Sequence, residues 1–148
     1  MTDVKSTEIF TEEIIRALET EETLTLATCA GNRVTIRPMS HICQGLAVYF
    51  QTDRNSLKMQ QIKENPNVAL CVGTYELEGT AAFAGKPLDA ENTFFAQLYK
   101  IKFPHAYALY SALDEEILVK VTLTRARQWR YIDGEPVLAE KRFDAEAL

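Results

Sequence analysis

Hydrophobic residues follow two different periods along the chain, and the longer period predicts two of the four expected helices. Phe10, Ile14 and Leu18 are spaced by four residues, as on one face of an α-helix. A second helical pattern ends at Asn65-Pro66, because the residue before a proline avoids helical backbone angles. Two further helices are predicted by Asp89, which can cap a helix start, and by Pro104, which suits the first turn of a helix. The last three helices are expected over residues 55–64, over residues 90–100 and from Pro104 onward.

A period of two, which is typical of strands with one buried face, covers most of the remaining chain. Three alternating runs are separated by turns at Gly31-Asn32 and Gly45, which predicts an antiparallel meander. Pro38 places the second run at a sheet edge or a bulge. Val68–Val72 is wholly apolar, which indicates burial on both faces. The pattern therefore predicts a mainly β fold, a small barrel of about six strands with helices between them. The strands are expected near residues 24–29, 34–37, 46–51, 68–72, 77–85 and 117–124.

The last predicted strand has an unusual face. Its apolar side holds alternate hydrophobic residues over 117–123, and the same positions then hold Arg125, Arg127, Trp129 and Tyr131. Either a bulge reverses the two faces, or this end faces a ligand or another subunit. We favour the second alternative, because Arg, Trp and Tyr are enriched at interfaces. Arg125, Arg127 and Tyr131 are then candidates for binding an anionic substrate, and a solvated strand end is the alternative.

Composition limits the classes of protein that fit this pattern. The length of 148 residues suits one domain, which we expect to span residues 1–148. The formal net charge of −5 argues against a nucleic-acid partner, and the longest aliphatic run is far too short to span a membrane. The first ten residues lack the apolar core of a secretory signal, so we expect a cytoplasmic protein.

Cysteine and histidine give no metal or disulfide signature. Cys29, Cys43 and Cys71 are too dispersed for a disulfide scaffold or a structural zinc site. His41 and Cys43 form a His-x-Cys pair, but nothing near them in the sequence completes a ligand set. We therefore predict no metal.

The chain also lacks the usual catalytic motifs, so its catalytic residues stay unassigned. It has no Gly-x-Gly-x-x-Gly before a helix, no phosphate-binding Walker loop and no Gly-x-Ser-x-Gly turn. If the protein is an enzyme, a bound cofactor carries the chemistry.

One segment suits a phosphate group. A predicted strand ends at Thr52 and a helix begins near Ser56, and a helix start offers free N–H groups and a partial positive charge. Lys58 adds a full charge, and Arg37 lies on the strand that we expect to pair with this one. Arginine binds phosphate through two parallel hydrogen bonds, and lysine acts as a point charge. The alternative is an ordinary capped surface helix.

The same residues carry a family resemblance. From about residue 24 to residue 85 the chain resembles the pyridoxamine 5′-phosphate oxidase-like, FMN-binding split-barrel proteins, through the order and spacing of its segments. These segments are Ala27-Thr28, Ile36-Arg37-Pro38-Met39, Val48-Tyr49-Phe50-Gln51-Thr52, Ser56-Leu57-Lys58, residues 61–70 and Glu78-Gly79-Thr80-Ala81.

The resemblance implies a six-stranded antiparallel Greek-key split barrel and a homodimer with FMN at the subunit interface. Arg37 and Lys58 match the family's contacts to the FMN phosphate, and Ser56 stands at the matching helix start. Trp129 corresponds to an aromatic residue that reaches the flavin from the partner subunit.

The resemblance also places residues along the flavin ring. Met39, with the backbone around Pro38 and Ser40, matches positions that line the isoalloxazine. Gln51 and Thr52 match a strand end that also touches the flavin.

Departures from the family pattern narrow the expected activity. Leu57 stands where the classical oxidase has an arginine, and no histidine follows His105 to bind pyridoxal phosphate. These differences argue against authentic pyridoxamine phosphate oxidation. We expect an FMN-dependent oxidoreductase that transfers electrons to or from a small molecule. The alternatives are a non-catalytic FMN-binding module or a haem-binding relative, with His41 or His105 as the histidine candidates for axial ligand.

Overall fold

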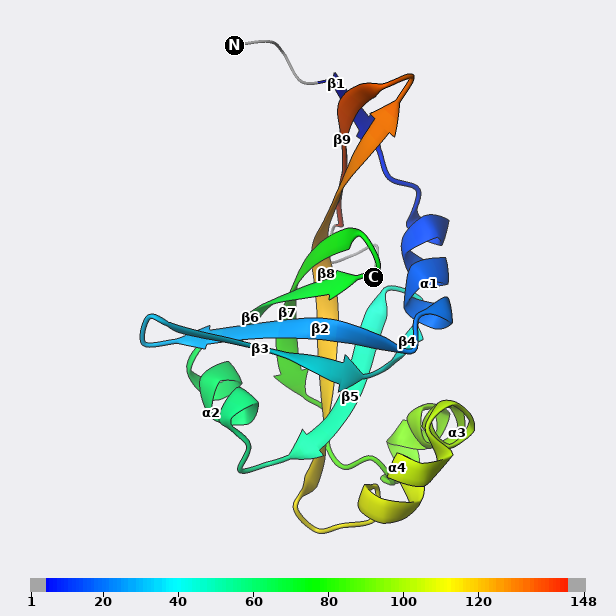
Figure 1. The fold of residues 1–148 in the computed structure, drawn as a ribbon. Coiled ribbons are helices and arrows are strands. Elements are labelled where there is room, and N and C mark those ends of the chain that lie inside the picture. Colours follow the sequence, from blue (N-terminus) through cyan, green and yellow to red (C-terminus); the bar gives the residue numbers. More distant parts are fainter. Residues whose placement is uncertain (1–4, 144–148) are drawn as a thin grey trace.

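Alternating hydrophobic residues build one mixed β-sheet whose longest strand runs through most of the molecule (Figure 1). The computed structural model describes residues 5–143. The strands are β1 (Lys5–Glu8), β2 (Thr23–Ala30), β3 (Arg33–Ser40), β4 (Ile42–Gln44), β5 (Ala47–Asp53), β6 (Asn67–Val72), β7 (Tyr75–Phe83), β8 (Glu116–Ile132) and β9 (Glu135–Arg142). The helices are α1 (Thr11–Thr20), α2 (Leu57–Glu64), the 3₁₀ turn η1 (Ala90–Asn92), α3 (Thr93–Lys102) and α4 (Pro104–Tyr110).

Strand β8 connects the two halves of the sheet. Residues 116–122 of β8 pair with β5, residues 119–127 pair with β7, and residues 125–132 pair with β9. Beyond β7 the order continues through β6 and β2 to β3, and β1 lies beyond β9. All pairs are antiparallel except β1 with β9. In Figure 1 the β2–β3 hairpin crosses in front of β8, with α2 below the hairpin, so the curled sheet encloses a core.

The structure confirms a mainly β fold with interspersed helices, but not the six-stranded Greek-key barrel. The described residues form nine strands, and the sheet does not close, because β3 pairs only with β2 and β4 only with β5. The predicted meander is wrong, since β5 pairs with the distant β8 rather than with β3. This pairing places Val48 opposite Val121. Phe50 likewise lies opposite Val119, and all four side chains are fully buried. Burial of apolar surface therefore decided the partner of β5, not proximity along the chain.

A bulge in the β7–β8 pair reverses the faces of β8. Gly79 lies opposite Leu123 and the residue before it lies opposite Arg125, which leaves Thr124 as an extra residue. The buried position consequently passes from Leu123 to Ala126, and both are fully buried. A Cβ on Gly79 would lie 2.7 Å from a β8 side-chain carbon and 2.8 Å from a β8 carbonyl oxygen, so only glycine fits here. Of our two alternatives for this strand, the structure shows the bulge.

Helices α1 and α2 bury most of the hydrophobic residues that the sequence period predicted to face the sheet. The hydrophobic residue at the start of each helix is exposed instead. In α1, Ile14 and Leu18 are buried, but Phe10 is 70% exposed. Phe10 precedes the first turn, and its backbone N–H donates to the Glu13 carboxylate at 2.9 Å. Leu57, the first residue of α2 after its cap Ser56, is 39% exposed. Within residues 5–143, no helix is both long and apolar enough to cross a membrane.

Strand β6 is buried on one face only, contrary to its apolar sequence. Val68, Leu70 and Val72 belong to the core, whereas Ala69 and Cys71 point outward and are exposed. The single chain therefore leaves the outer face of β6 uncovered.

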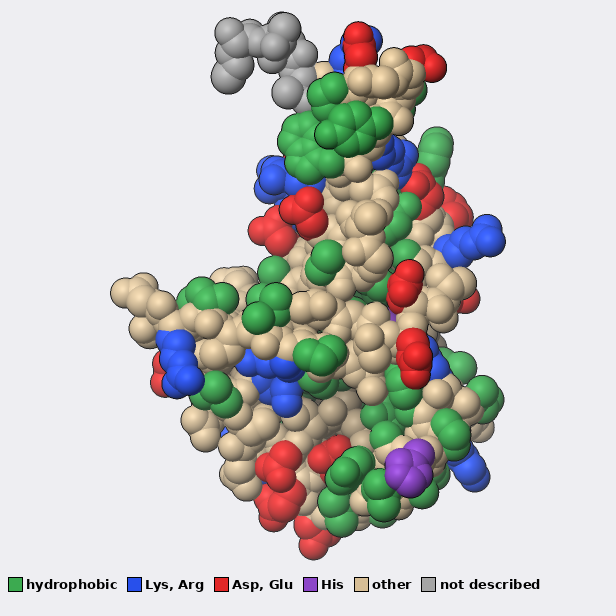
Figure 2. All heavy atoms as spheres, viewed as in Figure 1, with side chains coloured by type: hydrophobic (Ala, Val, Ile, Leu, Met, Phe, Trp, Pro, Cys, Tyr) green, Lys and Arg blue, Asp and Glu red, His purple; other side chains and the backbone are tan. Residues whose placement is uncertain are grey.

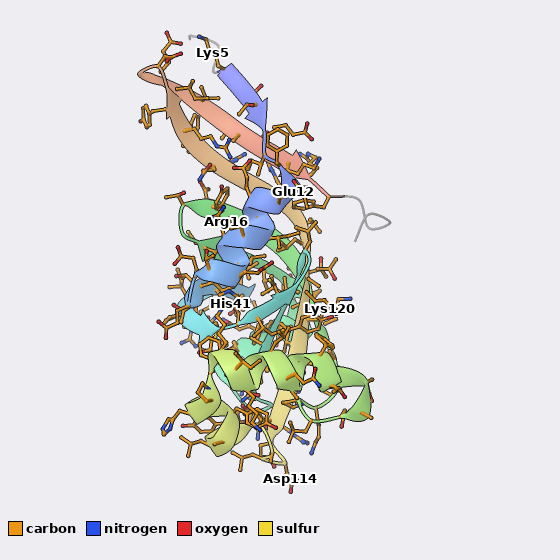
Figure 3. The ribbon with its side chains drawn as sticks, turned by 90° about the vertical axis from the view of Figure 1, so that its right-hand side faces the viewer. Lys5, Glu12, Arg16, His41, Asp114 and Lys120 are labelled. Atoms are coloured by element: carbon orange, nitrogen blue, oxygen red, sulfur yellow. The ribbon has the colours of Figure 1, made fainter. Side chains whose placement is uncertain are left out.

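His41 is buried where α1, β4 and α3 meet (Figure 3). Its Nε2 donates to the Leu18 carbonyl oxygen at 2.8 Å, while its Nδ1 has no hydrogen-bond partner among the described residues. Burial, together with the nearby Lys102 ammonium, lowers the pKa of His41 to about 4. The folded protein therefore holds this imidazole neutral near pH 7.

We expect His41 to make the protein less stable in mild acid. An unfolded histidine gains a proton below its ordinary pKa of 6.5, whereas folded His41 does not until about pH 4. The free energy of unfolding should fall as the pH drops through this window, by about 3 kcal/mol, and level off below it. Denaturant unfolding of the wild type and of His41→Gln at several pH values measures this, with exposed His105→Gln as control. Parallel profiles for the wild type and His41→Gln would contradict the prediction.

Candidate functional site

Three of the predicted cofactor residues lie around the start of α2. Ser56 caps this helix, because its Oγ accepts a hydrogen bond from the Met59 N–H at 3.4 Å. Lys58 lies in the first turn, and its Nζ donates to Oγ1 of Thr52, near the end of β5, at 2.9 Å. The Thr52 and Ser56 hydroxyls are 3.4 Å apart. The strand end and the helix start thus bring two hydroxyls and an ammonium together.

Arg37 reaches this cluster by a different route from the one predicted. Its strand, β3, pairs with β2 rather than with β5, and it is the edge of the sheet, as Pro38 indicated. Helix α2 contacts this hairpin through Gln61, which accepts hydrogen bonds from Thr28 and Thr35 at 2.5 Å. The hairpin and the helix together place Arg37 near Lys58.

Among residues 5–143, the guanidinium of Arg37 donates hydrogen bonds only to uncharged groups. Its Nη1 donates to Oγ1 of Thr28 at 2.8 Å and to the Leu26 carbonyl oxygen at 3.3 Å, and its Nη2 donates to Oγ1 of Thr35. Partial burial lowers the pKa of Arg37. The side chain is therefore held in place without a carboxylate to neutralise it.

Lys58 shares this environment. Burial and the charge of Arg37 lower the pKa of Lys58, while Glu116 and Asp53 act in the opposite direction. Within residues 5–143, neither Arg37 nor Lys58 takes part in an ion pair. We call the group formed by Arg37, Thr52, Ser56 and Lys58 the cationic cluster. Two adjacent, half-buried cations that form no ion pair within residues 5–143 favour binding of an anion.

The other predicted ring-contacting residues flank the cationic cluster. Pro38 is exposed on the edge strand, and Met39 and Ser40 are half-buried beside it. Gln51 is buried, but its side chain is already engaged. Its Nε2 donates to Glu116 at 2.9 Å, and its Oε1 accepts from Ser111 at 2.6 Å. A ligand could therefore contact Gln51 only through its backbone groups.

Trp129 does not lie with the cationic cluster in the single chain. It stands in the second half of β8, whereas Thr52 lies opposite Ile117 at the start of that strand. At the usual rise of a β-strand, this separation is about 40 Å along β8. Trp129 is half-exposed on the outward-facing end of the sheet.

The arginines proposed to bind an anionic substrate have an internal partner. The carboxylate of Glu140 accepts hydrogen bonds from Arg125 at 2.7 Å and from Arg127 at 3.1 Å. Arg125 also lies 3.7 Å from Glu78. These ion pairs favour the alternative, a solvated strand end, and Tyr131 beside them is 77% exposed.

Sequence reasoning missed two buried polar residues near the cationic cluster. Gln61 is 4% exposed, and the available signal was a polar residue on the apolar side of α2, next to Ile62. Glu116 is buried at the start of β8 beside Gln51. Burial and the nearby Asp53 raise the pKa of Glu116.

No residue of the cationic cluster lines either of two cavities of the single chain. One of about 490 Å³ lies on another side of α2, between Met59 and Phe83. Another of about 440 Å³ lies on the outer face of β2, β6 and β7, where Ile36, Ala69 and Cys71 line it. Arg37, Ser56 and Lys58 are only half-buried, so the cationic cluster is accessible to solvent in the single chain.

The histidines and cysteines show no ligand set in the described part of the chain. Among residues 5–143, no three His, Cys, Asp or Glu side chains are placed to hold a metal ion. Nε2 of His41 is already used by Leu18, and burial raises the pKa of the Cys43 thiol to about 11. His105 is exposed on α4.

The chain is similar to known proteins in sequence pattern and in fold. The model of a family described as pyridoxamine 5′-phosphate oxidase matches residues 10–130. No curated protein matches the chain in sequence. Among solved structures, General Stress Protein 26 from Bacillus anthracis str. Sterne has a TM-score of 0.65 and 24% identity, over 90% of this chain and 98% of that protein.

Two further similar structures are named for different ligands, one for heme and the other for FAD. The heme storage protein of Vibrio cholerae has a TM-score of 0.64 and 13% identity, over 76% of this chain and 88% of that one. A FAD-binding protein from Mesorhizobium loti has a TM-score of 0.62 and 11% identity, over 80% of this chain and 92% of that one. At these identities, the similarity shows the fold alone.

Proposed function

Because this chain belongs to the pyridoxamine 5′-phosphate oxidase family, we propose that it binds FMN and transfers electrons between this flavin and a small molecule. The observation that carries the proposal is the cationic cluster. Arg37 and Lys58 are half-buried, lie close together and have only neutral hydrogen-bond partners among the described residues. The phosphate of FMN, with close to two negative charges, balances their two positive charges.

The cluster matches the chemistry of a phosphate group in detail. Arg37 offers planar N–H donors, Lys58 offers an ammonium, and the start of α2 adds backbone N–H groups and a favourable dipole. Thr52 holds the Lys58 ammonium, and Ser56 starts the helix at this point. A terminal phosphate favours FMN over FAD, whose adenine would need a further pocket here.

The edge strand β3 provides a place for the ring of the flavin. Because β3 pairs only with β2 among the described residues, its free edge keeps unpaired backbone groups along the segment that holds Pro38, Met39 and Ser40, although Pro38 itself offers no N–H. We propose that these groups bind the polar edge of the isoalloxazine while Met39 contacts its face. The flavin supplies the electron transfer when it is bound, and the residues of this chain hold its phosphate and orient its ring.

We also propose that the functional form is a homodimer. The outer face of the sheet exposes apolar side chains that a monomer leaves in water, among them Val34 and Ile36, each 68% exposed, and Ala69 and Cys71. Figure 2 shows hydrophobic side chains along the β2–β3 hairpin and at the far end of the β8–β9 arm. A second copy would cover this surface and could bring its own Trp129 to a flavin that the first copy holds.

FMN retention tests the proposed cofactor site. The purified protein, loaded with FMN and desalted, should keep the visible absorption of an oxidised flavin. Arg37→Ala and Lys58→Ala should each weaken FMN binding about ten- to a hundredfold, because each removes a charge-assisted hydrogen bond. Lys63→Ala, at an exposed position of the same helix, should bind FMN like the wild type. Full retention of FMN by both cluster variants would show that the phosphate binds elsewhere.

Light scattering tests the dimer. The wild type should have twice the 16.7 kDa mass of one chain. Ile36→Glu places a charge on the exposed face of β3 and should shift the protein toward monomer, with weaker FMN retention. Ile101→Glu places the same charge on an exposed position of α3 and should leave the dimer unchanged. A stable wild-type monomer would rule out this assembly.

A further inference from the structure

Gln61 is buried between α2 and the β2–β3 hairpin, and its amide group has a hydrogen-bond partner on each side. Its Oε1 accepts from the hydroxyls of Thr28 and Thr35, each at 2.5 Å, and its Nε2 donates to the Arg33 carbonyl oxygen at 3.2 Å. A carbonyl oxygen can only accept, so it fixes which end of the amide faces Arg33. The oxygen of Gln61 must therefore face the two threonines.

This orientation sets the direction of the threonine hydrogen bonds. Each hydroxyl has one proton, and both donate it to Gln61 at 2.5 Å rather than to each other, although their oxygens lie 3.1 Å apart. The oxygens of Thr28 and Thr35 consequently keep free lone pairs, and these accept from Nη1 and Nη2 of Arg37. A neutral amide thus holds the guanidinium through two hydroxyls without cancelling its charge.

We infer that Gln61 is a positioning residue for the phosphate of the bound flavin, acting on Arg37 through Thr28 and Thr35. The inference rests on the proposed function and goes beyond it by naming what orients the arginine. A glutamate at position 61 would have nearly the same shape and could still accept from both threonines. Its negative charge, however, would neutralise Arg37 and repel the phosphate, and its second oxygen would face the Arg33 carbonyl.

The test compares FMN with riboflavin, which carries the same ring without the phosphate. For Gln61→Glu, we expect FMN affinity to fall about ten- to a hundredfold, as for loss of a charge-assisted hydrogen bond. Riboflavin affinity should change less than about threefold, since uncharged riboflavin does not use Arg37. The control is Gln60→Glu, which adds the same charge to an exposed neighbouring position of α2 and should change both affinities little. Flavin fluorescence titration measures the affinities of the wild type and of both variants for each ligand.

A second variant, Gln61→Met, tests the same role without adding a charge. Gln61→Met removes the acceptor at similar volume, so it should lower the ratio of FMN to riboflavin affinity about tenfold in the wild-type background. In an Arg37→Ala background it should not lower this ratio further, because the group that it positions is gone. Melting temperatures identify any variant that fails to fold.

The outcomes separate this inference from the proposed function. Equal weakening of FMN and riboflavin by both Gln61 variants would assign Gln61 a structural role only and overturn the inference. An unchanged affinity ratio in these variants, with a ratio lowered by Arg37→Ala, would also overturn it and leave the phosphate site standing. A wild type that binds FMN no better than riboflavin would overturn both.

Discussion

The burial of strand β8 from both sides is the constraint on which the rest of the fold depends. Ile117 and Val119 belong to the core inside the curled sheet, and Leu118 between them belongs to the second core under α3 and α4. A strand that is apolar on both faces needs cover on both faces. The curled sheet supplies one cover and the helix pair supplies the other, which draws β5 to β8 and sets the end of β5 beside the start of α2.

The cations at that junction differ from the arginines of β8 in how their charge is balanced. Arg125 and Arg127 share the carboxylate of Glu140, and Arg130 pairs with Glu13, so these arginines stabilise the arm formed by β8 and β9. Arg37 and Lys58 instead contact threonine hydroxyls. Holding two like charges together in a half-buried position costs free energy, which a bound anion offsets. The difference between these two sets of cations is the physical basis for assigning a phosphate to one and a structural role to the other.

The open position of the cationic cluster has a consequence for function. It lies along an edge strand and its cations are only half-buried, so a ligand on a single chain would stay exposed on one side. Flavin chemistry generally depends on an environment that orients the ring and limits the access of water. A second copy that covers the exposed apolar face of the sheet would supply that enclosure and contribute to selection of the substrate.

The sequence by itself determined the elements and the residue types of the site. The hydrophobic periods located the helices and most strands within a few residues. Pro38 marked the sheet edge, and the spacing of Thr52, Ser56 and Lys58 indicated a phosphate-binding helix start. These features depend on local backbone preferences, which neighbouring residues express directly.

Only the tertiary structure decided which strands pair and which polar groups meet. Adjacent runs suggested a meander, but burial of Val48 and Phe50 against β8 drew β5 away from β3. The bulge at Gly79 turned Arg125 outward to Glu140. The amide of Gln61, 33 residues from Thr28 along the chain, completed the support of Arg37. Such contacts join distant segments, and the free energy that selects them comes from burial of the whole sheet rather than from any local pattern.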